Sequence, residues 1–133
     1  MSVTLSSESN WITKMDHSLD RTYRKARHLE RSIRKDISYV RREIMGNGNR
    51  PTFIQELDLQ ATQSYSNVSA LSHKLEIDHL AKKLNKSVTR INHQVDKFSE
   101  ESTQELQRLI KKSNDLALLL DVTLKLTNRL EGV

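Results

Sequence analysis

The sequence predicts an all-α protein, built as an elongated antiparallel helical hairpin or a three-helix coiled-coil bundle. Strand-rich folds need many turns, and turns draw on Gly and Pro. The 133 residues include only three Gly and one Pro. Three of these four residues stand between residues 46 and 51, so two long tracts remain in which apolar residues recur at helical spacing.

The composition limits the class of protein further. Hydrophobic residues make up 35% of the chain and charged residues 29%, and there is no cysteine, which excludes disulfides and thiolate metal sites. The polar N-terminus lacks the features of a signal peptide. The longest apolar run, residues 116–120, is far shorter than the ~18 residues of a membrane span. We therefore expect a soluble intracellular protein, cytoplasmic or nuclear, that meets membranes only indirectly.

The first tract predicts one basic amphipathic helix over residues 10–45, preceded by a flexible N-terminus over residues 1–9. Its apolar positions recur with a mean step of about 3.7 residues, which is typical of a nearly straight helix. They form a stripe wide enough to pack on a partner helix. The stripe consists of Trp11, Met15, Leu19, Tyr23, Ala26, Leu29, Ile33, Ile37, Val40 and Ile44.

Positive charge gathers on the side of this helix away from the apolar stripe. Arg side chains, which predominate there, hold carboxylates and phosphates with two parallel bonds. The charge is either a solvated helix back or a surface for an acidic protein, a nucleic-acid backbone or anionic lipid. Nucleic acid is the weaker candidate, because few aromatic residues lie near the charges. The basic patch consists of Arg21, Arg24, Lys25, Arg27, Arg31, Lys35 and Arg42.

Residues 46–51, GNGNRP, predict the turn of a helical hairpin, because Gly and Asn tolerate positive φ. Residues 52–131 then predict a long helical tract. Its apolar face rotates by roughly 160° beyond residue 75, and serine favours local hydrogen bonds over a helix interior, so we expect a bend near residues 63–75. A capping box at Ser102 and Glu105 marks a second candidate break, near residues 99–102.

The second tract also contains the predicted contacts with other proteins. Residues 84–98 carry a heptad pattern, and residues 106–130 are apolar around most of the helix circumference. A hairpin offers too little surface to cover both, so we expect another helical chain to cover them; the alternative is that residues 106–130 fold back as a third helix and are buried internally. The predicted contact residues are Leu84, Val88, Ile91, Val95, Phe98, Leu106, Leu109, Leu116, Leu120 and Leu124.

Nothing in the sequence predicts catalysis, a cofactor or a metal site. Glu76 and His79 have the spacing found in di-iron bundles, but that site needs a second such pair and two further glutamates. No Gly-rich phosphate loop or nucleophile elbow frames the serines and histidines. We therefore expect that the protein is not an enzyme.

In composition and periodicity the chain is similar to the small coiled-coil subunits of eukaryotic scaffolds, such as organelle-tethering or kinetochore assemblies. This similarity implies a non-enzymatic structural subunit that assembles with other helical chains, as a hetero- or homo-oligomer, in a multi-protein complex. Two alternatives remain open. One is an adaptor that binds nucleic acid or an anionic surface through the basic patch, and the other is a stand-alone three-helix regulatory bundle.

Overall fold

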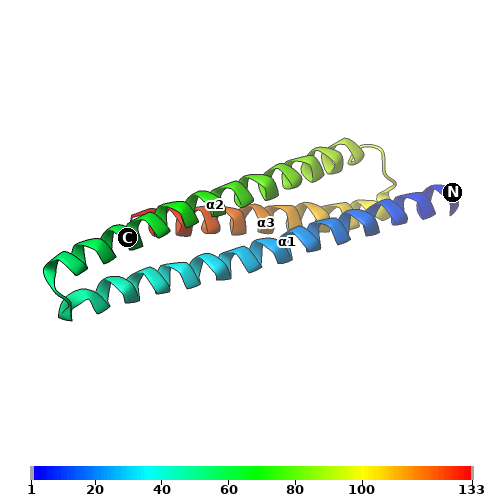
Figure 1. Cartoon of the computed structure of the whole chain (residues 1–133). Helices are drawn as coiled ribbons and strands as arrows, with labels where there is room; N and C mark the ends of the chain where they lie inside the picture. Colours follow the sequence, from blue (N-terminus) through cyan, green and yellow to red (C-terminus); the bar gives the residue numbers. More distant parts are fainter. Residues whose placement is uncertain (1, 133) are drawn as a thin grey trace.

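A computed structural model describes residues 2–132, with side chains described from residue 7 onward, as three long helices packed against one another (Figure 1). No strand is present among these residues, so the predicted all-α bundle is confirmed. The elements are α1 (Ser2–Met45), the short 3₁₀ helix η1 (Gly46–Asn49), α2 (Thr52–Gln94) and α3 (Glu100–Glu131).

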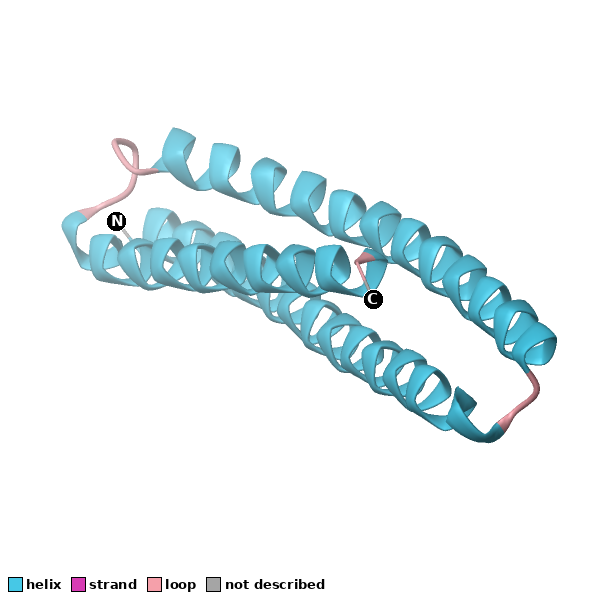
Figure 2. Cartoon of the chain, turned by 90° about the vertical axis from the view of Figure 1, so that its left-hand side faces the viewer, coloured by secondary structure: helices cyan, strands magenta, loops and turns pink. Residues whose placement is uncertain are grey.

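The two connections lie at opposite ends of the bundle, so α2 runs antiparallel to α1 and α3 (Figure 2). The predicted turn forms where the Gly and Pro residues cluster. Pro51 cannot continue a helix from the preceding turn and has extended backbone with ψ of 145°. Two contacts join this turn to α2. Arg50 forms an ion pair with Asp58, and the Gln55 side-chain amide donates a 2.6 Å hydrogen bond to the Arg50 carbonyl.

The core lies along the apolar stripe of α1, as its periodicity predicts, except that Tyr23 and Ile44 are each 38% exposed. Ala26, Ile33 and Val40 are fully buried. At the end of the bundle where α2 connects to α3, Trp11 and Phe98 pack edge to face with ring centroids 5.4 Å apart, and both contact the core. Each fully buried aliphatic side chain contributes about 1.5–3 kcal/mol relative to an exposed one, so this stripe is a main source of stability.

The third helix supplies the other large part of the core, contrary to the expectation that another chain covers its leucines. Leu106, Leu109, Leu116 and Leu120 are each 6% exposed or less, against α1 and α2. The premise that this chain cannot cover them is wrong, because α3 lies against both other helices along its length and not against only one. The alternative kept open from the sequence, an internal third helix, is what the structure contains.

Buried hydroxyl groups allow α3 to be polar in places without losing hydrogen bonds. Ser113, Thr123 and Thr127 are at most 4% exposed. Each donates to the carbonyl four residues earlier, at 2.9, 2.6 and 2.9 Å. Because these bonds are made within the helix itself, the hydroxyls need no partner across the core.

The predicted bend near residues 63–75 does not occur. α2 is continuous from Thr52 to Gln94. The serines of this segment are accommodated in the helix, since Ser66 donates to the carbonyl of Leu130 across the core and Ser69 bonds Asp36 of α1 at 2.5 Å. The rotation of the apolar face therefore changes which surface is apolar and leaves the helix unbroken.

The second break is present but lies earlier than predicted, at residues 95–99, and α3 begins at Glu100. Residues 2–9, expected as a flexible N-terminus, are helical, because α1 begins at Ser2. The start of α3 has a physical cause in a contact with α1. The buried Glu8 carboxylate accepts bonds from the Ser99 backbone N–H at 3.0 Å and from the hydroxyls of Ser99 and Ser102 at 2.7 Å each. Glu8 thus caps α3 in place of the predicted Ser102 capping box.

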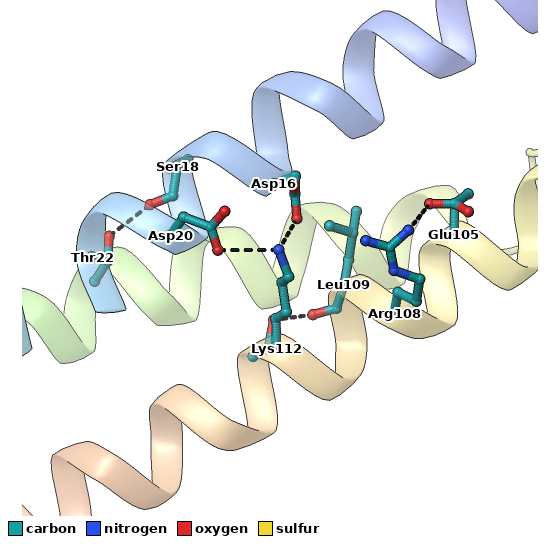
Figure 3. Close-up of polar contacts among 9 residues, drawn as sticks. Asp16, Ser18, Asp20, Thr22, Glu105, Arg108, Leu109 and Lys112 are labelled. Carbon is teal, nitrogen blue, oxygen red and sulfur yellow. Dashed lines mark hydrogen bonds and ion pairs between the residues drawn. The ribbon is translucent and has the colours of Figure 1, made fainter. Parts of the chain in front are cut away.

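A second polar link joins α1 to α3 in the same half of the bundle. Lys112 of α3 points at α1 and forms ion pairs with Asp16 and, at 3.1 Å, with Asp20 (Figure 3). The hydrogen bond to Asp16 raises the pKa of Lys112 more than burial lowers it, and the bond to Asp20 raises it further. The two aspartates lie one helical turn apart, so a single ammonium group reaches both.

Replacing Leu116 with Ala tests whether α3 is an internal helix. We expect Leu116→Ala to lower the free energy of unfolding by about 2–5 kcal/mol, because it leaves a cavity in the core. Leu118→Ala is the matched control; Leu118 is 66% exposed, so its loss changes the free energy of unfolding by at most about 0.5 kcal/mol. Urea denaturation measures both, and equal effects would contradict this placement of α3.

The Glu8 cap predicts a pH-dependent stability. Hydrogen bonds from the Ser102 hydroxyl first, and then from the Ser99 hydroxyl and backbone, hold the pKa of Glu8 below its ordinary value of 4.5. Its contribution is therefore complete above pH 4.5 and is lost as the pH falls through the lower folded-state pKa. Glu8→Gln should lower the melting temperature at pH 7 and make it less sensitive to acid below pH 4.5; Glu105→Gln, whose partner Arg108 is an exposed neighbour, should change neither.

Candidate interaction surfaces

An apolar face of α2 is directed to solvent. Leu57, Val68, Leu71 and Leu75 are 59–69% exposed, although long aliphatic side chains usually turn toward the core. They recur at the spacing of a coiled-coil seam. We define the α2 seam as Leu57, Ala61, Ser64, Val68, Leu71 and Leu75, all of them exposed.

The opposite face of the same segment is polar and points inward. Thr62, Ser66 and His73 are at most 8% exposed, as is Ala70. Beyond residue 76 the helix returns to the usual arrangement, with Ile77, Leu80, Leu84 and Ile91 buried. The two halves of α2 thus turn different kinds of face toward the core, and only the first half leaves its apolar side uncovered.

A polar cluster between α1 and α2 holds the first half of α2 in this orientation. The Asp36 carboxylate accepts bonds from Ser69 at 2.5 Å, from Tyr65 at 2.9 Å and from His73 Nε2 at 2.7 Å. Tyr65 also packs edge to face on Tyr39, with ring centroids 5.1 Å apart. Turning the seam inward would break all of these bonds, so the polar cluster fixes which face of α2 is exposed.

The four inner positions of the seam lie in the longest uncharged stretch of a highly charged chain, and Leu57 and Leu75 lie just beyond its ends. Residues 59–72 contain no Asp, Glu, Lys or Arg, whereas 29% of the whole chain is charged. Depletion of charged residues is typical of the centre of a protein–protein interface. The exposed apolar face therefore lacks the charged residues that would keep it solvated.

The third helix ends before it reaches the turn between α1 and α2, which widens the exposed apolar area. The Leu130 carbonyl, one residue from the end of α3, bonds Ser66. The first part of α2 consequently extends past α3 beside α1 alone, as the position of the C-terminus in Figure 1 shows. Met45 and Phe53 lie at this end and are 83% and 65% exposed.

The predicted contact residues do not form one exposed surface. Leu84, Ile91, Leu106, Leu109, Leu116 and Leu120 are buried in the core, and Val88 and Phe98 are half-buried against it. Only Val95 and Leu124 remain exposed, at 38% and 39%. The heptad over residues 84–98 describes packing within this chain. The sequence signal for the exposed seam is the apolar face of α2 before residue 75. The rotation between this face and the later one was the basis of the predicted bend, which does not occur.

All seven residues of the basic patch are exposed, as the helical periodicity predicts. They do not share one surface, however. Arg21, Arg24 and Lys25 line grooves shared with α2, whereas Arg27 lines a groove shared with α3 and bonds Glu30 at 3.1 Å. Lys35 and Arg42 lie beside Tyr39 and Tyr65. Packing of the three helices therefore divides the patch.

Within residues 2–132, no group of three or more His, Asp or Glu side chains is arranged to hold a metal ion. In the same part of the chain, none of the helices combines the length and the apolar character needed to cross a membrane. No protein-family model, curated protein or solved structure matches the chain.

The Asp36 cluster makes a prediction about pH. Burial alone would raise the pKa of Asp36, but the bonds from Ser69, His73 and Tyr65 outweigh burial and hold it below its ordinary value of 3.8. The cluster therefore stabilises the fold fully above pH 3.8, and this contribution is lost as the pH falls through the lower folded-state pKa. We expect Asp36→Asn to cost about 1–3 kcal/mol at pH 7.

Thermal unfolding followed by circular dichroism at pH 7 and at about pH 2 checks this prediction. The gap in melting temperature between wild type and Asp36→Asn should narrow as the pH falls. Asp121→Asn is the control, because Asp121 is exposed and pairs with the neighbouring Lys125. A gap that stays constant down to pH 2 would show that the Asp36 charge does not stabilise the cluster.

Proposed function

We propose that the protein is a non-enzymatic structural subunit that assembles through the α2 seam, and that its partner there is a second copy of the same chain. The observation that carries this proposal is the 59–69% exposure of Leu57, Val68, Leu71 and Leu75 on a helix whose opposite face is buried and polar. Removing such a face from water is the dominant driving force of protein association.

The spacing of the seam favours a second copy. Its six positions are separated by 4, 3, 4, 3 and 4 residues, so the order of steps is the same in both directions. An antiparallel copy related by a two-fold axis presents the same series of side chains. Large then meets small in the inner layers: Leu71 lies opposite Ala61, and Val68 opposite Ser64. At the ends of the seam Leu57 meets Leu75.

The uncharged middle of the seam supports the same partner. A partner helix with charged residues at this surface would have to remove them from water without an opposite charge to pair with. A second copy brings the uncharged residues 59–72 against themselves. Polar side chains such as Gln60 and Asn67 would then lie at the rim of the interface, where they remain in contact with water.

The size of the seam predicts a weak dimer. From Leu57 to Leu75 the helix rises about 27 Å, and the contact is one helix wide. A contact of this length and width is smaller than the standard specific interface, which buries about 800 Å² per partner. We therefore expect a dissociation constant in the micromolar range.

Light scattering coupled to size-exclusion chromatography at about 100 µM tests the proposal. Wild type should have the mass of a dimer. The double variant Val68→Ser, Leu71→Ser should have the mass of a monomer and keep the helical signal of wild type, because neither side chain belongs to the core. Leu118→Ser, Val122→Ser is the matched control, since it removes two exposed apolar side chains from α3 and should leave the dimer intact.

Two results would contradict the proposal. Wild type with the mass of a monomer at this concentration would show that the seam does not hold two copies together. A dimer that survives in the seam variant but dissociates in the α3 control would place the interface on α3.

A further inference from the structure

Five cations from two helices line one groove between α1 and α2. Arg21 and Lys25 come from α1, and Lys83, Lys86 and Arg90 come from α2. The α2 members step by 3 and 4 residues, so they lie on one side of that helix. The first two belong to the basic patch predicted from the sequence; the other three do not, and only packing of α2 on α1 brings them together.

No carboxylate lines this groove among the residues that the structure describes, and none of its five cations forms an ion pair with a described residue. Other basic residues of the bundle are paired, as Lys112 is with Asp16 and Lys82 with Asp78. Repulsion from Lys25, then burial and the charge of Arg21, lower the pKa of Lys83. All five cations are exposed, and like charges gathered at one groove attract an anion that carries several negative charges.

The rest of the lining indicates which anion fits. Ser18 and Ser87 contribute hydroxyl groups, which donate hydrogen bonds to phosphate oxygens as Arg and Lys do. The groove has a volume of about 280 Å³, just below the range typical of pockets for drug-sized ligands. No aromatic side chain lines it, so there is no platform on which a base could stack.

From this geometry we infer that the groove formed by Arg21, Lys25, Lys83, Lys86 and Arg90 is a binding site for a compact ligand that carries several phosphate groups. Two sources supply this chemistry: a soluble inositol polyphosphate and the headgroup of a phosphoinositide lipid. The neighbouring groove, lined by Arg24, His28 and again Lys25, extends the positive surface toward His79 and also contains the acidic Glu76.

This inference does not depend on self-association. The groove involves the part of α2 after residue 82, whereas the α2 seam ends at Leu75. Loss of phosphate binding and loss of the dimer are consequently separate outcomes. A variant that affects one site should leave the other unchanged.

Isothermal titration of the full chain with inositol hexakisphosphate at about 100 mM salt tests the site. We expect binding that weakens steeply as salt rises, because the ligand and the groove are both highly charged. The double variant Lys83→Gln, Lys86→Gln should weaken binding at least ~10-fold, since it removes two charge-assisted bonds. Its melting temperature should equal or exceed that of wild type, because the substitutions relieve repulsion.

Lys111→Gln, Lys125→Gln is the matched control. It removes the same charge from exposed positions on α3 and should bind the ligand as wild type does. Co-sedimentation with phosphatidylcholine vesicles that contain 5% phosphatidylinositol 4,5-bisphosphate, or the same vesicles without it, separates the two sources. Binding to the phosphoinositide vesicles that is abolished by free inositol hexakisphosphate identifies the lipid headgroup as the ligand. Binding of inositol hexakisphosphate without binding to these vesicles identifies the soluble compound as the ligand.

Three outcomes would overturn the inference. In the first, neither inositol hexakisphosphate nor the phosphoinositide vesicles bind at low salt. In the second, the α3 control loses as much affinity as the groove variant, which would mean that the overall charge attracts the ligand. In the third, a 20-base-pair DNA duplex binds more tightly than inositol hexakisphosphate and depends on Lys83 and Lys86, which would identify the groove as a nucleic-acid site.

Discussion

The bundle depends on the burial of one face of α3 between α1 and α2. Leu106, Leu116 and Leu130 are at most 1% exposed, and residues of this kind contribute about 1.5–3 kcal/mol each on burial. Because α2 is a single unbroken helix, it can turn only one side toward this core, and its later half places Ile77, Leu80 and Leu84 there. The apolar side of its first half then has to point away from the core. The exposed seam is thus a consequence of joining two different apolar faces in one unbroken helix.

The sequence was sufficient where the signal is local. The all-α class, the apolar stripe of α1 and the turn at residues 46–51 follow from spacing and from Gly and Pro alone. It was insufficient where the outcome depends on distant partners. The rotation of the apolar face along α2 is real, but the sequence does not say that Asp36 of α1 bonds Ser69 and His73 and so fixes which face of α2 is exposed. The capping of α3 by Glu8 was missed for the same reason, since 91 residues separate Glu8 from Ser99.

The candidate sites show the same limit. Periodicity correctly identified that the basic patch is exposed and that the chain carries more apolar surface than a two-helix hairpin covers. It assigned the excess to α3, because α3 is richest in leucine, and the packing of three helices assigns it to α2. Likewise Lys83, Lys86 and Arg90 step at helical spacing in the sequence, but their proximity to Arg21 and Lys25 depends on how α2 lies on α1. The chain thus separates its uncharged surface, before residue 76, from its most cationic one.

The Glu8 cap also bears on the order in which the protein folds. The Glu8 carboxylate accepts two hydrogen bonds from Ser99 and one from Ser102, so this contact closes a loop of more than 90 residues. Closing so long a loop is entropically costly, and contacts distant in sequence tend to form late. During synthesis, α1 and α2 are complete before the first turn of α3 leaves the ribosome. The hairpin therefore has time to assemble first, and docking of the third helix is expected to be the closing step.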